Sequence, residues 1–241
     1  MAIDGVREQC YIALMSHHEN KRARQLTFAQ HLRRKGKKRG WKKSPDSGVS
    51  HLKRCEVSED VPVHATLKVE EGLPDLRDFG VYEVLWNVFE AARERAGRKL
   101  DGWFGLAHYS IQGNHVHLIV EASDRDALSR GMNGLCVRLA RRLNKLWKRT
   151  GKVFADRFHH RPLRTPREVY NALRYIFNNA RKHGRGTWKG RPDPFSSGLW
   201  FEGWKDYVHD GWVAVAGPIA QAKTWLLAQG WRRHGLLVLR P

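Results

Sequence analysis

The fold is decided between Gly113 and Glu121, where the sequence reads GNHVHLIVE. Successive side chains of a β-strand point to opposite faces, so this pattern predicts a strand with aliphatic side chains at alternate positions from Val116 on one face. That apolar face predicts a covering layer of helices. His115 and His117 then share the opposite face, about 7 Å apart along the strand. This spacing suits two nitrogen ligands of one divalent metal ion, although a bare His-x-His pair also fits two polar residues on an exposed face.

Further strands and helices are predicted on both sides of this segment. The signals are apolar residues at alternate positions for strands, and apolar stripes at steps of three and four for helices. Strands are predicted over 62–70, 102–112, 115–122 and part of 152–164, and helices over 80–97 and 124–149. Thr165-Pro166 starts one more helix, because proline suits the first helical position.

The order of these elements is β-α-β-β-α-β, which is the ferredoxin-like plan of an α+β protein. In that plan the first and third strands lie side by side at the centre of an antiparallel sheet, and both helices cover one face. A tyrosine-bearing helix, a basic N-terminal tail and a C-terminal extension complete the predicted architecture. The predicted domains are a tail over 1–61, a core domain over 62–183 and an extension over 184–241.

The helix predicted over 124–149 has one apolar and one basic face. Its apolar stripe consists of Leu128, Met132, Leu135, Leu139, Leu143 and Leu146. Basic side chains on the remaining surface can bind phosphates. We predict DNA contacts from four of them, Arg138, Arg141, Arg142 and Lys145.

Charge is the strongest signal in the composition. The chain has 44 Lys and Arg against 24 Asp and Glu, a formal net charge of +20. So much positive charge repels itself in a folded protein, and this predicts a polyanionic partner such as DNA. The segment from Lys21 to Arg54 predicts a flexible tail that binds phosphates without reading sequence, or one that only solubilises the chain. Its densest candidate contacts are Arg33, Arg34, Lys35, Lys37, Lys38 and Arg39.

Several other classes of protein fit this sequence poorly. No apolar run approaches the roughly 20 residues that span a bilayer, so no membrane partner is predicted. The N-terminus lacks the pattern of a signal peptide. Three widely separated cysteines suggest neither a disulfide framework nor a thiolate zinc site. A reducing cytoplasm is the predicted location.

A second candidate group lies in the helix that starts at Pro166. Tyr175 and Asn179 are four positions apart, so they lie on one helix face a turn apart. A tyrosine oxygen can attack phosphorus when a metal ion polarises the phosphodiester. Asn179 can offer that ion a neutral oxygen ligand. Taken alone, a helical tyrosine fits a core or rim position equally.

These segments together resemble the REP-associated tyrosine transposases. The resemblance rests on the Gly-Asn-His-Val-His-Leu strand, the basic helix after it, the VFADRFH segment from Val153, and the Leu-x-Tyr-x-x-x-Asn helix, and it covers about residues 62–183. That family is a single-tyrosine branch of the HUH endonucleases, related to the transposases of the smallest bacterial insertion sequences. Its helix often reads Tyr-Ile-His-x-Asn-Pro, whereas here Phe177 and Ala180 replace the histidine and the proline.

The resemblance implies a single-stranded DNA endonuclease and strand transferase. It implies that Tyr175 is the nucleophile, that it forms a 5′-phosphotyrosyl link and leaves a free 3′-hydroxyl, and that the DNA is single-stranded or a hairpin. It also implies that His115, His117 and Asn179 bind Mg²⁺ or Mn²⁺.

Two alternatives remain open at the level of sequence. A domesticated transposase can keep the fold and the DNA site without turnover. A two-histidine phosphoesterase would use His64-Ala65-Thr66-Leu67 as one His-x-Thr element, but the second element would be His115-Val116-His117-Leu118, which lacks the Ser or Thr. Those enzymes act without metal and do not account for the charge, so metal dependence separates them from a transposase.

Overall fold

The computed structural model describes residues 56–96, 102–182, 190–207 and 217–239. The chain divides into two compact units, 1–53 and 54–241, and every described residue belongs to the second. The predicted basic tail, with its six candidate contacts from Arg33 to Arg39, therefore lies outside the described residues.

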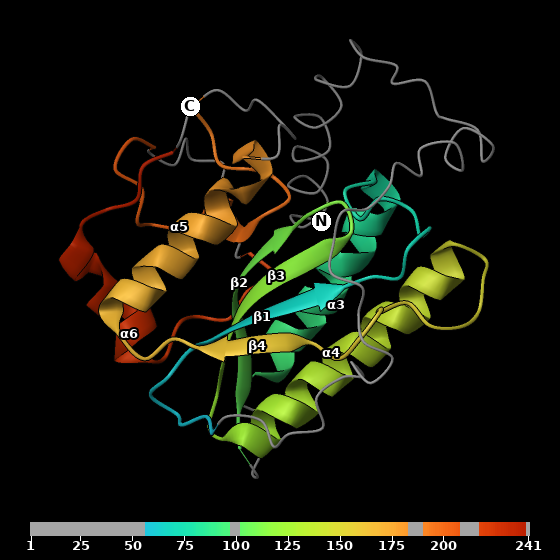
Figure 1. Cartoon of the computed structure of the whole chain (residues 1–241), viewed down its shortest axis with the longest axis horizontal. Helices are drawn as coiled ribbons and strands as arrows, with labels where there is room; N and C mark the ends of the chain where they lie inside the picture. Colours follow the sequence, from blue (N-terminus) through green and yellow to red (C-terminus); the bar gives the residue numbers. More distant parts are fainter. Residues whose placement is uncertain (1–55, 97–101, 183–189, 208–216, 240–241) are drawn as a thin grey trace, which may run out of the picture. The chain divides into compact units, whose positions relative to one another are not determined.

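A four-stranded antiparallel sheet forms the centre of the second unit (Figure 1). Its strands are β1 (Val63–Lys68), β2 (Phe104–Ile111), β3 (His115–Ala122) and β4 (His159–Pro162), in the spatial order β2-β3-β1-β4. The first and third strands are neighbours, as the ferredoxin-like plan predicts. Their register places Thr66 opposite His117 and Lys68 opposite His115.

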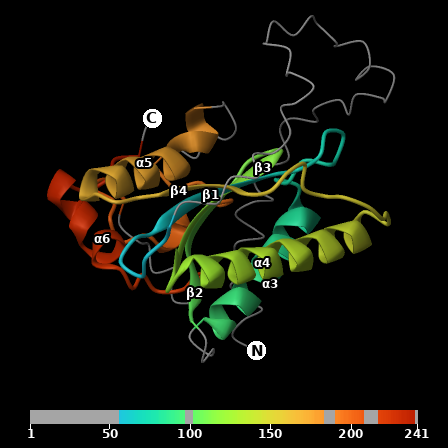
Figure 2. The same cartoon turned by 60° about the horizontal axis from the view of Figure 1, so that its bottom comes forward.

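Two helices, α3 (Phe79–Arg95) and α4 (Arg125–Leu146), cover one face of the sheet (Figure 2). Each begins at an aspartate whose carboxylate accepts backbone N–H groups of the first turn, Asp78 for α3 and Asp124 for α4. Their apolar stripes pack on the aliphatic side chains of the strands. The layer includes Leu67, Leu85, Leu118, Leu128 and Leu135, each at most 1% exposed.

The predicted stripe of α4 fails at its last position. Leu146 is 42% exposed, because α4 ends there and the side chain lies beside Gly80, about 3.8 Å from where a β-carbon on that glycine would stand. Gly80 has no side chain to cover Leu146 further. The helix also ends earlier than the predicted boundary at residue 149, with Trp147 as its C-cap.

The fourth strand occupies part of the segment 152–164, as predicted. Val153 and Ala155 hydrogen-bond with Glu70 and Lys68 at the far end of β1, and pairing with β1 then resumes only at His159. Residues 155–157 form a bend, and within it the Asp156 side chain accepts the N–H of Arg157. This local hydrogen bond replaces ladder pairing.

The helix α5 (Pro166–Lys182) lies on the other face of the sheet (Figure 2). It packs with α6 (Trp225–Ala228) and η3 (Gly230–His234) around a second apolar core, while η2 (Ser197–Trp200) lies against β2. Members of that core are Ile119, Leu173, Phe177, Trp204 and Trp231. Trp231 is only 1% exposed, so it is a core residue. No helix of the described part is long and apolar enough to cross a membrane.

Candidate metal and nucleophile site

The two histidines of β3 lie on the face that α5 covers. Val116, Leu118 and Val120 take the face toward α3 and α4, where each is at most 1% exposed. Strict alternation along the strand then turns His115 and His117 to the opposite side. The histidines point away from α3 and α4, as the alternating pattern requires for a metal site.

The reactive nitrogens of His115 and His117 converge. Their Nε2 atoms are 3.1 Å apart, and the rings are nearly perpendicular at 85°. Two nitrogens bound to one ion at about 2.0–2.1 Å lie roughly 2.8–3.4 Å apart for bond angles between a right angle and the tetrahedral angle. The observed separation therefore fits two ligands of one ion.

Both rings are held through their other nitrogen, Nδ1. The Nδ1 of His115 lies 2.8 Å from the side-chain oxygen of Asn114. The Nδ1 of His117 lies 3.2 Å from the hydroxyl of Thr66 and 3.2 Å from the Nε2 of His64. A partner at Nδ1 favours the tautomer with the proton on that atom and a lone pair on Nε2, which is how metal-binding histidines are oriented.

His64 and Thr66 are functional candidates that the sequence did not assign to this site. Burial, and then the neighbouring charges of Arg161 and His159, lower the pKa of His64 from 6.5 to about 4. Its imidazole is therefore neutral at neutral pH and can share a hydrogen with His117. The His64-x-Thr66 pattern was visible in the sequence, but its contact with His117 depends on the pairing of two strands about fifty residues apart.

Tyr175 lies directly beside the histidines. Its ring centroid is 5.1 Å from that of His117 and 6.2 Å from that of His64. The residue is 44% exposed, while its neighbours Leu173 and Ile176 carry the packing of α5 with no exposure. The Tyr175 side chain is thus open to a ligand and is not required for the core.

Asn179 carries a buried side-chain amide that the described part of the chain leaves without a hydrogen bond. It is 1% exposed, and neither its side-chain oxygen nor its nitrogen has a hydrogen-bond partner among the described residues. Buried amides are normally satisfied, since an unpaired polar group costs about 1–3 kcal/mol. The neighbouring Asn178 shows the usual case, because its amide donates to the carbonyl of Arg174.

The described residues contain no group of three or more His, Cys, Asp or Glu side chains that could hold a metal ion. His64 directs its Nε2 to His117 and does not converge with the pair. An ion bound by the two histidines would need further ligands, and the oxygens of amides, water and phosphates are ligands that Mg²⁺ accepts.

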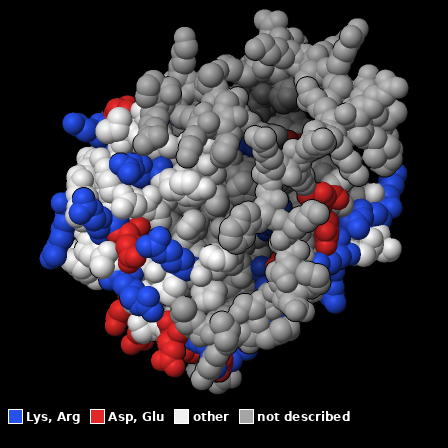
Figure 3. All heavy atoms as spheres, viewed as in Figure 1, with Lys and Arg blue, Asp and Glu red and all other residues white. Residues whose placement is uncertain are grey.

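Basic side chains surround the helix that carries Tyr175. Arg161 on β4, Arg164 before α5, and Arg167 and Arg174 on α5 all reach the surface. Figure 3 shows blue Lys and Arg side chains on the side of the molecule where α5 lies, with some red acidic side chains among them. One of these arginines, Arg161, forms an ion pair with Glu168.

The predicted DNA contacts on α4 do not join this site. Arg138, Arg141, Arg142 and Lys145 belong to a helix on the opposite face of the sheet from His115. Arg141 and Lys145 reach the surface, as does Arg142, and Arg138 is partly buried. If these residues bind DNA, they bind a part of it that does not lie at Tyr175.

A comparison with solved structures finds a likeness of fold. The chain is similar to a structure described as that of a REP-associated tyrosine transposase bound to a REP hairpin, with 16% sequence identity and a TM-score of 0.49, over 61% of this chain and 82% of that one. No protein-family model and no curated protein matches the sequence. The function proposed below therefore rests on the geometry of the site.

Proposed function

We propose that the protein is a metal-dependent endonuclease and strand transferase of single-stranded DNA, with Tyr175 as its nucleophile. One observation carries the proposal. An exposed tyrosine lies 5.1 Å, ring to ring, from His117, whose Nε2 converges with that of His115. A nucleophile beside two histidines oriented for metal binding is an arrangement suited to phosphoryl transfer.

The residues present fit a divalent ion, Mg²⁺ or Mn²⁺. His115 and His117 would hold it through Nε2, and Asn179 would be the third protein ligand, because its buried amide has no other partner among the described residues. All three ligands are neutral. When bound, the ion would stabilise the negative charge that develops on the phosphate during attack.

Tyr175 would supply the attacking oxygen. A tyrosine hydroxyl has a reference pKa of about 10, so it is mostly protonated at neutral pH and must lose its proton as it attacks. The new bond joins the tyrosine oxygen to phosphorus, and the bond from phosphorus to the 3′-oxygen breaks. The 3′-oxygen leaves and takes up a proton, so the products are a 5′-phosphotyrosyl link and a free 3′-hydroxyl.

A metal-free phosphoesterase is the second candidate, because His64 and Thr66 lie on the same face as His117. In such an enzyme two histidines must both direct a nitrogen to the phosphate. Here His64 directs its Nε2 to the Nδ1 of His117, which makes it a support for His117. A DNA-binding protein that does not cut DNA would have the same fold and charge, so an activity assay is needed to distinguish it from the proposed endonuclease.

The test is formation of a covalent adduct. The full-length protein is incubated with end-labelled hairpin oligonucleotides and Mn²⁺, and the products are separated on a denaturing gel. We expect a protein–DNA band that Tyr175→Phe abolishes while DNA binding persists, and that chelation of the metal also abolishes. Tyr170→Phe is the matched control, since Tyr170 packs near His234, 5.8 Å between ring centroids, and should retain the band.

Three results would overturn the assignment. An adduct that persists in Tyr175→Phe would show a different nucleophile. Phosphodiester hydrolysis without metal, abolished in His64→Ala but kept in Tyr175→Phe, would favour the phosphoesterase. Tight DNA binding with no adduct on any oligonucleotide of a broad hairpin library would favour a protein without turnover.

A further inference from the structure

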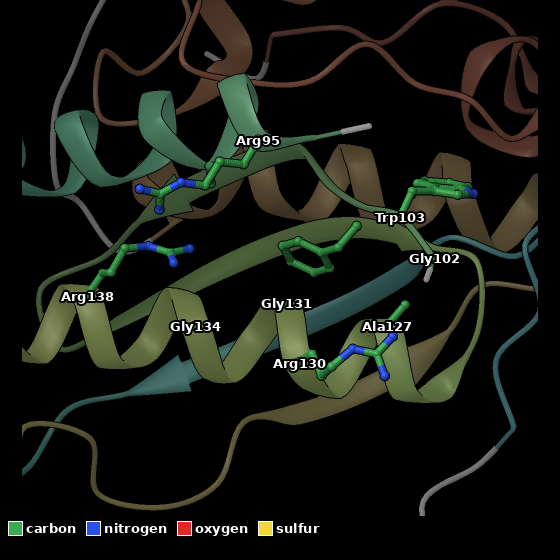
Figure 4. A pocket seen from close by; sticks show the side chains of 10 residues that line it. Arg95, Gly102, Trp103, Ala127, Arg130, Gly131, Gly134 and Arg138 are labelled. Atoms are coloured by element: carbon green, nitrogen blue, oxygen red, sulfur yellow. The ribbon is translucent and has the colours of Figure 1, made fainter. Parts of the chain in front are cut away.

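A hollow lined by arginines lies on the face of the sheet opposite the histidines. It has a volume of about 120 Å³ and is bounded by α3, α4 and the start of β2. In Figure 4, Arg95 of α3 and Arg138 of α4 approach each other at one end, and Trp103 and Arg130 lie toward the other end. Among the described residues, none that lines the hollow is acidic.

Small residues of α4 create the space. Ala127, Gly131 and Gly134 line the hollow at steps of four and three, so they share one face of the helix. A β-carbon on Gly131 would come within 2.2 Å of the Phe104 ring, so this glycine lets the ring lie against the helix backbone. Glycine inside a helix costs about 1 kcal/mol relative to alanine, and here the cost is offset by that contact.

At the Arg95–Arg138 end of the hollow, the described lining residues supply positive charge and no acidic side chain. Burial, followed by the charges of Arg95 and Arg142, lowers the pKa of Arg138. The Nε of Arg138 is buried and has no hydrogen-bond partner among the described residues. By contrast, Arg130 is near Asp124, whose carboxyl pKa is lowered by hydrogen bonds from the Ala127 backbone and the Ser123 hydroxyl and also by the charge of Arg130. A partly buried guanidinium without an acidic partner favours an anion as ligand.

We infer that this hollow binds one backbone phosphate of nucleic acid, held between the guanidinium groups of Arg95 and Arg138. Its volume is below the roughly 300 Å³ at which pockets for drug-sized ligands begin. A hollow of this size suits a single phosphate group. The planar guanidinium also matches the oxygens of a phosphate in a bidentate contact.

The surroundings favour a polymer as the source of that phosphate. The chain has a net charge of +20, and the ammonium of Lys223 lies 4.3 Å from the centroid of the Trp103 ring beside the hollow. The positively charged surface around the hollow is therefore larger than a single bound phosphate requires. The inference rests on the nucleic-acid partner of the proposed function but not on its chemistry, because the sheet separates the hollow from Tyr175.

The two faces would then hold different parts of one DNA molecule. A segment at Tyr175 lies on the α5 side, and a phosphate at Arg138 lies on the α4 side. A single DNA that reaches both must pass around the sheet, as a folded hairpin with a single-stranded extension can do. The hollow would retain the DNA while the other face carries out the chemistry.

Binding of a labelled hairpin oligonucleotide of arbitrary sequence to the full-length protein tests the inference. The measurement is fluorescence anisotropy with EDTA present, over a series of salt concentrations. Arg138→Gln and Arg95→Gln should each weaken binding about tenfold at low salt and lower the slope of log affinity against log salt by about 0.9. The double variant should bind little more weakly than either single variant, since both side chains hold the same phosphate.

Arg125→Gln is the matched control, because Arg125 lies on the same helix, has a side-chain exposure of 38% and does not line the hollow. If the control variant lost as much affinity as Arg138→Gln, the effect would come from net charge alone, and the inference would be wrong. So would unchanged binding by Arg138→Gln, or a wild-type protein that does not bind the oligonucleotide. Arg138→Lys keeps the positive charge and most of the side-chain length, so it is the variant least expected to misfold. Lysine cannot make a bidentate contact with a phosphate. Wild-type affinity in Arg138→Lys would therefore contradict a bidentate site.

Covalent adduct formation is measured on the same variants at saturating oligonucleotide. The adduct should persist in Arg138→Gln, because Tyr175 and the histidines are untouched. Absence of the adduct in wild-type protein with the binding differences intact would refute the proposed chemistry alone. The reverse pattern would refute the phosphate site alone.

Discussion

His117 is better supported than its partner His115. Its Nδ1 lies between the Thr66 hydroxyl and the His64 ring, and the residue is only 5% exposed. His115 is more open and depends on the adjacent Asn114 side chain. The two proposed ligands therefore differ in how much of the fold holds them in place.

Removal of the Thr66 hydroxyl should weaken metal binding. Thr66→Val keeps the shape of the side chain but removes one partner of the His117 Nδ1. Because outer partners of metal-binding histidines typically contribute 10–100-fold in affinity, we expect Mn²⁺ affinity, measured by titration calorimetry, to fall about tenfold. Thr66→Ser should retain the wild-type affinity, and equal affinities for all three proteins would contradict a positioning role.

Sequence reasoning reached the histidines of β3 but not their supports. Alternation along one strand is local, so the shared face of His115 and His117 follows from their spacing alone. The position of His64 beside His117 depends on the register of β1 against β3, which no local pattern contains. The geometry of Tyr175 against His117 depends likewise on how α5 crosses the sheet.

At the scale of elements, a buried ion pair attaches the C-terminal region to the core. Arg77, between β1 and α3, donates two hydrogen bonds of 2.8 Å to the carboxylate of Asp193 and a third to the carbonyl of Ile111 at the end of β2. Asp193 has a side-chain exposure of 1% and Arg77 one of 11%. The arginine also lies 4.2 Å from the centroid of the Phe195 ring.

Removal of one partner should destabilise the protein strongly. Asp193→Ala leaves the Arg77 charge buried and unpaired, so we expect the free energy of unfolding, measured with urea, to fall by about 3–5 kcal/mol. Lys152→Gln is the comparison. Lys152 forms an ion pair with Glu70, and the two side chains are 63% and 40% exposed, respectively. Exposed ion pairs contribute about 0–1 kcal/mol to stability. Similar decreases in the two variants would show that burial does not decide the effect.

The C-terminal elements were harder to predict than the core. Strong periodicity identified α3, α4 and the central strands, and their order predicted the sheet topology. Residues 190–239 carry no such period, because their apolar side chains, such as Phe201 and Trp204, fill the α5 side from turns and short helices. Irregular segments of this kind find their place only through tertiary contacts.

At the scale of the whole molecule, a buried histidine should make the fold sensitive to acid. His108 packs against Phe177 and Phe201, and burial lowers its pKa from 6.5 to about 3. The unfolded chain therefore takes up a proton below about pH 6.5 while the folded chain does not. Stability should be complete above that pH and fall as the pH decreases toward the folded pKa of His108.

The melting temperature between neutral and mildly acidic pH measures this effect. His108→Phe removes the titrating group and keeps an aromatic ring, so its melting temperature should fall less than that of the wild-type protein over this interval. Parallel pH curves for the two proteins would show that His108 does not contribute to acid sensitivity.

The basic N-terminal unit should contribute to DNA affinity for the whole chain. Residues 1–53 carry 13 Lys and Arg against 4 Asp and Glu. A chain that begins at Arg54 keeps Val57, which is buried, and Ser58, which pairs with Asp124. We expect this deletion to weaken binding to any oligonucleotide and to flatten its salt dependence by about 0.9 in slope for each phosphate that the segment neutralises. Unchanged affinity at both low and high salt would show that the segment has no part in DNA binding.

The pairing at the outer edge of β2 has a consequence for aggregation. An open sheet edge is a template to which another chain can add a strand. Here the carbonyl of Phe195 accepts the N–H of Ile111, and the N–H of Ala220 donates to the carbonyl of Leu106, so later parts of the same chain occupy this edge. The opposite edge, β4, has four residues and ends in a proline. The β4 edge is too short for extended strand pairing, and the β2 edge is already occupied. Two copies could therefore pair along β2 only if one of them first released its own C-terminal segment.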